Sequence, residues 1–306
     1  MSGTLYALLP EHRDFRPEQG LQRWLARGDR LPDLADAHRA TLRKLFTLDA
    51  DGLPVAALRH QAHVDAPVEG NWVCADPAYV RSEATGARLM AWPINDLKPV
   101  DGSALATALQ PLFAETRAQL MIDAPSTWCL QVPAALSAAD YTDPRAALGA
   151  DLLDCLPGGA NGRGWRKLFS EAQVVLHAHP VNAAREAAGK VPVNALWFWG
   201  AGALPGTITS ALHAVIATDP LLRGVARAAG VTCTTSAAGL GDPPGKAGDV
   251  LLECNGQGDS VAAATGLAAA RKWLRAGRFD TIVVVFAGGE RYRVRRVHAL
   301  RVWRRA

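Results

Sequence analysis

Apolar positions along this chain follow two kinds of spacing, and each predicts a different element. Recurrence every three to four residues predicts helices over 18–26, 33–48, 97–118, 163–178, 219–229 and 259–276, with an interruption near Pro111. Short apolar runs bounded by turn residues predict strands over 1–10, 54–59, 127–133, 194–199, 249–253 and 280–286, and 207–217 is expected to be extended. The segment 71–92 is expected to form two short strands around a proline turn.

These elements predict an α/β fold with a mainly parallel or mixed sheet and flanking helices. Strand, helix and strand alternate between 190 and 286, as they do where crossover helices join parallel strands. We divide the chain into an N-terminal α/β region (1–135), a turn-rich linker or lid (136–163) and a C-terminal α/β region (164–306).

One stretch, from His177 to Gly202, combines three kinds of local structure. Proline disfavours the helical conformation at the residue before it, so His179-Pro180-Val181-Asn182 predicts a polar corner after a helix. The segment 183–190 can form a short helix carrying Arg185, and an apolar strand from Asn194 ends in a turn at Gly200-Ala201-Gly202.

We expect a ligand-binding site in this stretch, with the side chains of its polar residues lining one pocket beside the glycine turn. Its candidate residues are His179, Asn182, Arg185, Asn194, Gly200 and Gly202. An arginine can hold a phosphate or carboxylate with two parallel hydrogen bonds. The alternative is structural, with Asn182 and Asn194 as caps and Arg185 in a salt bridge to Glu186 or another nearby acid.

The order of these motifs is similar to that in archaeal-type cofactor-independent phosphoglycerate mutases, of the alkaline-phosphatase-like superfamily. The shared features are HPVN, Arg185 three residues on, a glycine, an Asn-Ala pair, an apolar strand and Gly-x-Gly. The aromatic version NALWFWGAG, after WRKLFSEAQVVLHAHPVN, more closely resembles the bacterial RpfE-type regulatory proteins derived from those mutases. The resemblance implies a reduced alkaline-phosphatase-like domain.

The same resemblance implies two divalent metals, Mn or Mg, and a Ser or Thr nucleophile in an active mutase. The family's metal ligands lie in Asp-Gly, Asp-x-x-x-His and Gly-Asp-His segments. This chain contains no Asp-x-x-x-His and no Asp-His pair, and Ala287-Gly288-Gly289-Glu290 follows its last apolar strand. We therefore assign no catalytic residue, no metal ligand and no cofactor. His60 and His63 are a possible metal pair, with a solvated loop as the alternative.

The composition of the chain also indicates where in the cell the protein is expected. Hydrophobic residues make up 49% of the chain and charged residues 20%, as in globular proteins with a packed core. No apolar run has the length of a membrane span and no signal peptide is visible, so we expect a cytoplasmic protein with no membrane partner. Five scattered cysteines without C-x-x-C favour reduced thiols.

The net charge of +4 comes from the last residues, since 291–306 contain seven arginines and no acid. The alternating arginines could follow a nucleic-acid backbone. We favour an edge strand that its charge protects from aggregation, with Val302 and Trp303 packed down, so a nucleic-acid partner is not expected. The segment Ser236–Gly241 is expected to be a flexible turn.

These patterns favour a non-catalytic, phosphoglycerate-mutase-like protein that regulates or senses a ligand. Its expected partner is a regulatory protein or a small phosphorylated metabolite. The two alternatives are an active metal-dependent phosphoglycerate mutase and a nucleic-acid-binding regulator that uses the arginine-rich tail.

Overall fold

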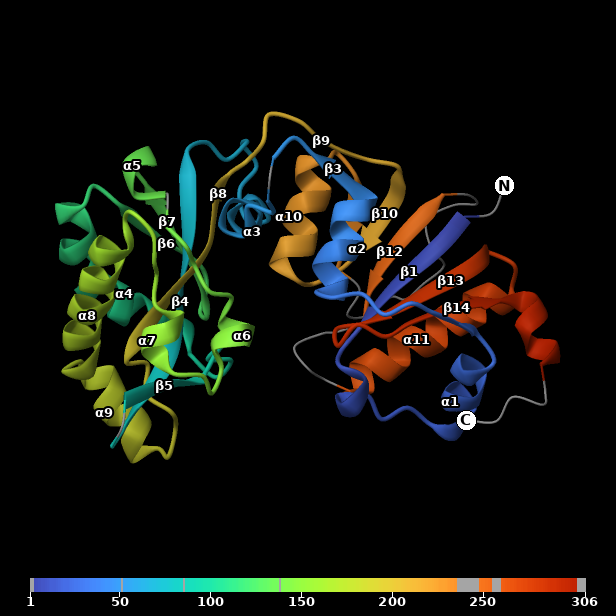
Figure 1. Cartoon of the computed structure of the whole chain (residues 1–306), viewed down its shortest axis with the longest axis horizontal. Coiled ribbons are helices and arrows are strands. Elements are labelled where there is room, and N and C mark those ends of the chain that lie inside the picture. Colours follow the sequence, from blue (N-terminus) through green and yellow to red (C-terminus); the bar gives the residue numbers. More distant parts are fainter. Residues whose placement is uncertain are drawn as a thin grey trace. The chain divides into compact units, whose positions relative to one another are not determined.

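The computed structural model describes residues 3–50, 52–84, 86–137, 139–235, 248–254 and 260–301, and divides the chain into two compact units (Figure 1). Unit 1 comprises Met1–Asp51 and Pro205–Ala306, and unit 2 is the intervening Gly52–Leu204. This division differs from the expected boundaries at 135 and 163. Unit 1 is discontinuous in sequence because its N-terminal strand pairs with strands from the C-terminal third of the chain.

Among the described residues, unit 1 contains a seven-stranded sheet in the order β11-β10-β12-β1-β13-β14-β2. Its strands are β1 (Gly3–Leu9), β2 (Asp29–Leu31), β10 (Leu212–Ile216), β11 (Thr232–Thr234), β12 (Asp249–Glu253), β13 (Phe279–Phe286) and β14 (Arg291–Arg295). The first five in this order run parallel, whereas β14 and β2 are antiparallel additions. The predicted α/β fold with a mainly parallel or mixed sheet is confirmed.

Helices cover both faces of this sheet. They are α1 (Gln19–Ala26), α2 (Ala37–Leu45), α10 (Pro220–Ala228) and α11 (Ser260–Arg275), with the short 3-10 helices η1 (His12–Asp14) and η3 (Arg296–Leu300). The main core of unit 1 lies between the strands and α1 with α11, where Leu21, Trp24 and Trp273 are buried. The small antiparallel pair β3 (Phe46–Leu48) and β9 (Ile208–Ser210) completes the described part of the unit.

The basic strand β14 is not an edge strand, which corrects the expectation for the tail. It lies between β13 and β2, and β2 forms the edge. The sequence pattern could not show this, because β2 comes from residues far earlier in the chain. Val302, Trp303 and the segment Ser236–Gly241 lie outside the described residues.

Unit 2 is built around β4 (Asn71–Glu83), which pairs with three other strands. Its other strands are β5 (Gly86–Ala91), β6 (Gln119–Ala124), β7 (Thr127–Val132) and β8 (Ala195–Ala203). The expected break at the proline is wrong, since β4 continues through Pro77. On the side away from β8, pairing with β7 ends at Cys74 and pairing with β5 begins at Tyr79. A strand tolerates proline at a position where no neighbouring strand needs a hydrogen bond from its backbone nitrogen.

The strand β8 was predicted to belong to the parallel sheet of the C-terminal half, and that assignment is wrong. It pairs antiparallel with β4 in unit 2, from Ala78↔Ala195 to Asn71↔Ala203. A short buried apolar run has the same pattern in either kind of sheet, so the sequence alone does not identify its partner.

The helices of unit 2 pack around these strands, and α4 contacts α8 (Figure 1). They are α3 (Val55–Gln61), α4 (Pro99–Glu115), α5 (Ala134–Ser137), α6 (Pro144–Ala147), α7 (Leu152–Cys155), α8 (Gly162–His177) and α9 (Pro180–Ala187). The strand predicted at 54–59 is in fact helix α3, and α4 runs through Pro111 without interruption. The expected linker or lid, 136–163, contains the end of α5, all of α6 and α7, and the start of α8. No described helix combines the length and the apolar composition that crossing a bilayer requires.

Candidate functional site

The HPVN corner, residues 179–182, joins α8 to α9 as its proline predicts. His179 is the N-cap of α9, and its Nδ1 accepts the Val181 N–H at 3.2 Å. Pro180 occupies the first turn, where a missing N–H costs no helical hydrogen bond. His179 therefore has a helix-capping role in this structure.

Asn182 connects the end of α8 to the segment that leads into β8. Its Nδ2 donates to the carbonyl oxygens of Leu176 and Val193, both at 2.7 Å, and its Oδ1 accepts the Val193 N–H at 2.8 Å. The residue is only 3% exposed. These bonds use both functional ends of the amide, so Asn182 has the structural role that the sequence left as an alternative.

Arg185 is buried and forms its salt bridge with an acid distant in sequence rather than with Glu186. Its Nε donates to the Val191 carbonyl at 2.8 Å, and its Nη2 contacts Asp96 Oδ1 at 2.6 Å. Lys190 Nζ lies 3.2 Å from the other oxygen of Asp96. The hydrogen bond from Arg185, together with that from Lys190, lowers the pKa of Asp96 below its ordinary value.

Asn194 and the two glycines lie at different places along β8. Asn194 exchanges two hydrogen bonds with the backbone of Val80, at 2.8 Å each. Gly200 has φ +63° and Gly202 has φ +155°, and a Cβ at these positions would meet Val55 and Pro54 at 2.9 and 2.7 Å. A register shift in the β4–β8 ladder occurs opposite this stretch, so the glycines form an irregularity within the strand.

The expected shared pocket is therefore not what the structure shows. A strand rises about 3.3 Å per residue, which places Gly200 about 20 Å from Asn194. His179, Asn182 and Arg185 belong to the helical corner, Asn194 bonds to β4, and the glycines pack on α3. The six candidates do not line one cavity, and their binding of a ligand remains a prediction.

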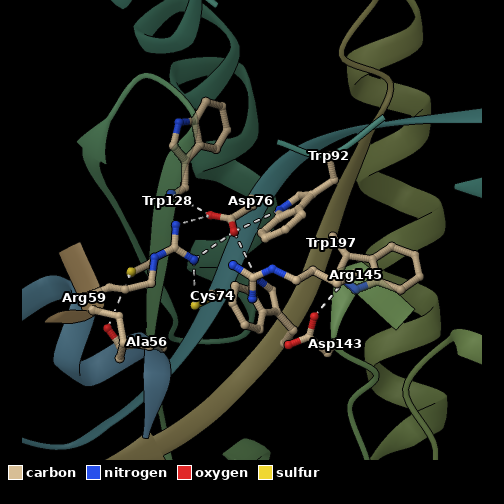
Figure 2. Close-up of polar contacts among 12 residues, drawn as sticks. Ala56, Arg59, Cys74, Asp76, Trp92, Trp128, Asp143, Arg145 and Trp197 are labelled. Atoms are coloured by element: carbon tan, nitrogen blue, oxygen red, sulfur yellow. Dashed lines mark hydrogen bonds and ion pairs between the residues drawn. The ribbon is translucent and has the colours of Figure 1, made fainter. Parts of the chain in front are cut away.

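A second polar centre, absent from the sequence predictions, surrounds Asp76 in the middle of β4 (Figure 2). This aspartate is fully buried, at 0% exposure. Both terminal nitrogens of Arg59 on α3 donate to its carboxylate, at 2.8 and 2.9 Å. The indole N–H groups of Trp92 and Trp199 donate to Oδ2 at 3.1 and 2.9 Å, and the Trp128 backbone N–H donates to Oδ1 at 3.1 Å.

The electrostatics of this centre favour a permanent ion pair. Burial alone lowers the pKa of Arg59, but the charge and hydrogen bonds of Asp76 outweigh it, and the pKa is raised well above its ordinary value. The hydrogen bond that Cys129 shares with Cys74, together with burial, raises the pKa of the Cys129 thiol. A thiol held in its protonated form is a poor nucleophile. With five donors on two oxygens, Asp76 is suited to stabilising the fold rather than to proton transfer.

His60 lies next to this centre in sequence and contacts Asp123 on β6. Its Nδ1 lies 2.7 Å from Asp123 Oδ1, and its ring stacks on Trp72 with a centroid distance of 4.2 Å. His60 is buried, whereas His63 is exposed. The two side chains therefore occupy different environments.

The carboxyl ends of the parallel strands in unit 1 are the place where α/β sheets usually bind ligands. Here His12 Nδ1 lies 3.6 Å from Glu290 Oε1. Glu253 Oε2 accepts hydrogen bonds from the backbone and hydroxyl of Thr218 and from the Asp219 N–H. Burial, together with the charge of Asp219, raises the pKa of Glu253.

These acidic groups do not form the ligand set that two divalent ions would need. Within the part of the chain that the structure describes, no three His, Cys, Asp or Glu side chains come together to hold an ion. Of the described residues at this edge, His12 and Glu290 contact each other, and Glu253 contacts the backbone and hydroxyl of Thr218. These described side chains do not fit the metal pair that the resemblance implies.

Comparison with known proteins places the similarity among the phosphoglycerate mutases. No family model matches the chain. The 2,3-bisphosphoglycerate-independent phosphoglycerate mutase of Methanosarcina barkeri is 35% identical over 97 residues, which cover 30% of this chain and 24% of the relative. That of Methanosarcina acetivorans is 33% identical over 133 residues, which cover 42% of this chain and 31% of the relative. The matches thus span about a quarter to a third of the relatives' length.

Two solved structures are similar over more of the chain. The cofactor-independent phosphoglycerate mutase from Thermoplasma acidophilum aligns with 95% of this chain and 88% of its own, with 16% identity and a TM-score of 0.42. A Pyrococcus horikoshii protein aligns with 96% of this chain and 87% of its own, with 14% identity and a TM-score of 0.47.

Proposed function

We propose that this phosphoglycerate-mutase-like chain acts without catalysis, as a regulatory or ligand-sensing protein of the bacterial RpfE type. The observation that carries the proposal is the state of the HPVN corner, the segment on which the resemblance rests. Its amide and guanidinium groups contact the protein's own backbone and Asp96. Side chains held in this way stabilise the fold, and their polar groups are bonded within the protein rather than directed at a substrate.

The absence of the implied metal motifs from the full sequence supports the same proposal. An active mutase of this kind needs carboxylate and imidazole ligands for two divalent ions. The chain has neither Asp-x-x-x-His nor an Asp-His pair. Of the described acids at the sheet edge of unit 1, Glu290 pairs with His12, and Glu253 accepts hydrogen bonds from Thr218 and Asp219. The relatives are mutases of phosphoglycerate, so a small phosphorylated acid is the ligand class that we propose to be sensed.

The test combines an activity assay with a binding assay on the purified full chain. 3-Phosphoglycerate is supplied with Mn²⁺, and formation of 2-phosphoglycerate is followed by ³¹P NMR. We expect no turnover above the protein-free control, and no fall in melting temperature when EDTA is added. Turnover that requires Mn²⁺ and disappears with EDTA would establish the active-mutase alternative instead.

The Arg185→Ala variant separates a structural corner from a ligand-binding one. In a structural corner the variant melts at a lower temperature, and 3-phosphoglycerate shifts neither protein through Arg185. In a ligand-binding corner, 3-phosphoglycerate raises the melting temperature of the wild type and not of the variant. The exposed Arg81, which pairs with Glu83 on β4, provides the control substitution Arg81→Ala in the same unit.

A further inference from the structure

A cavity of about 380 Å³ lies in unit 1, where α1, α11 and the segment around η3 meet. Its volume falls within the range of small-molecule binding sites, about 300–1,000 Å³. The residues that line it are Gly20, Arg23, Trp24, Arg27, Arg271, Leu274, Arg275, Arg295, Arg296 and Ala299. We call this cavity the arginine pocket.

Six of the ten lining residues are arginines and none is acidic. They come in pairs from three segments that are distant in sequence, near α1, on α11 and at the junction of β14 with η3. A guanidinium stays charged at any physiological pH, and its planar donors match phosphate oxygens. Folding of unit 1 therefore gathers six permanent positive charges around one cavity.

The contacts of these arginines only partly compensate the charge. Arg271 Nη1 donates to the Gly20 carbonyl at 3.2 Å, and Arg27 Nη1 donates to the Ala299 carbonyl at 3.3 Å. The Nε atoms of Arg27 and Arg271 are buried, and among the described residues they have no hydrogen-bond partner. Buried donors of this kind are rare unless another group satisfies them.

Electrostatic repulsion among the arginines is a second indication that the positive charge of the pocket is not fully compensated. Burial and then the charge of Arg275 lower the pKa of Arg271, the nearby Glu18 opposes this effect, and Arg27 adds to it. Another acid of unit 1, Asp29, accepts a hydrogen bond from Arg301 at 2.6 Å and lies 3.7 Å from Arg293. A bound anion would relieve the repulsion that these contacts leave.

We propose that the arginine pocket binds a small anion that carries two or more phosphate groups. The arginines surround a cavity, which suits a compact ligand, and Trp24 and Leu274 supply an apolar wall. Several phosphate groups are required to engage pairs of guanidinium groups that arrive from three directions.

A nucleic-acid backbone is a poorer match for this arrangement. It would need a row of free cations that continues beyond the pocket along β14. Arg291 instead donates twice to the Pro32 carbonyl, at 3.0 and 2.7 Å, and Arg293 faces Asp29. The proposal does not depend on whether the chain has mutase activity, because the pocket lies outside both polar centres of unit 2.

Calorimetric titration of the full chain with inorganic tripolyphosphate at 0.15 M NaCl tests the proposal. The pocket variant is Arg275→Gln with Arg296→Gln, two exposed arginines of the lining. The control is Arg43→Gln with Lys44→Gln, which removes the same charge from exposed positions of α2 in the same unit. We expect saturable binding to the wild type, at least a tenfold loss in the pocket variant, and nearly wild-type affinity in the control.

Three results of the binding measurements would overturn the proposal. The first is that tripolyphosphate shows no saturable binding, and the second is that the pocket and control variants lose the same affinity for it. The third is that a single-stranded oligonucleotide binds more tightly than tripolyphosphate, with an affinity that grows with the length of the oligonucleotide. A measurement on the wild type alone keeps the test valid even if the variants misfold. Tripolyphosphate should raise the wild-type melting temperature more than sodium chloride at equal ionic strength, and an equal effect of the two salts would also refute the pocket.

Discussion

Replacing Asp76 with asparagine tests the buried ion pair of unit 2 with almost no change in side-chain volume. Both carboxylate oxygens of Asp76 face only donors, from Arg59, Trp92, Trp199 and Trp128. Whichever oxygen becomes an amide nitrogen, that nitrogen meets at least two donors. The substitution also leaves the Arg59 charge buried without its partner.

The expected loss of stability follows from these contacts. Removing one partner of a buried ion pair costs about 3–5 kcal/mol. For a unit the size of Gly52–Leu204, each kcal/mol lowers the melting temperature by roughly 2–4 °C, so Asp76→Asn should lower it by about 6–20 °C. Urea unfolding at 25 °C, followed by tryptophan emission, gives the free energy directly, because two of the donors to Asp76 are indoles.

The control is Glu83→Gln on the same strand, where the glutamate pairs with Arg81 and Arg88 near the surface. Solvent screens such pairs, so this variant should unfold almost as the wild type does. If Asp76→Asn has the same unfolding free energy as the control and the wild type, the ion pair does not stabilise unit 2. Should Asp76→Asn fail to fold, Arg59→Lys retains the charge but loses the paired hydrogen bonds, and its stability should be intermediate.

Three further substitutions test individual contacts. Asn182→Ala removes three hydrogen bonds at the HPVN corner and should lower the unfolding free energy by about 2–4 kcal/mol in urea; unchanged stability would deny the residue its structural role. Gly200→Ala should lower the melting temperature, because of the positive φ and a Cβ 2.9 Å from Val55, whereas the helical Gly164→Ala has open space and should not. The lowered pKa of Asp96 contributes stability above the unfolded pKa of about 3.9, and this stability is lost as pH falls through the folded pKa. Arg185→Met should flatten the acid side of the wild-type pH–stability curve, and parallel curves would contradict the assignment.

Local elements with one buried face were predictable from the sequence. The helix expected at 163–178 is α8, and its buried residues Trp165, Leu168 and Ala172 follow helical spacing. The β-branched run DTIVVVF became β13, one of the central strands of unit 1. Both predictions succeeded because burial leaves a signal in the residues themselves, which is a helical period in α8 and a continuous β-branched run in β13.

Helix α3 shows where that signal fails. All seven of its residues are buried, so no exposed face interrupts the apolar pattern, and the segment was expected to be a strand. Its polar residues are compensated by distant partners. Arg59 bonds to Asp76, His60 contacts Asp123, and Gln61 bonds to the backbone at Val64, Ala66 and Val68. A polar residue in sequence suggests exposure, and only the fold reveals that its partner is also buried.

The six candidate residues do not come together in one pocket for a related geometric reason. We expected Gly200 and Gly202 to close a turn beside the polar corner, because they follow the corner closely in sequence. An extended strand instead separates its ends by about 26 Å over nine residues, so the segment carries the glycines away from Asn194. The one sequence clue to the Asp76 centre was an acid inside the apolar run VCADPAYV. A buried acid is rarely left unpaired, so this position called for a cationic partner, but Arg59 stood in a segment expected to be a strand. Its identification required knowing that α3 is a helix packed against β4.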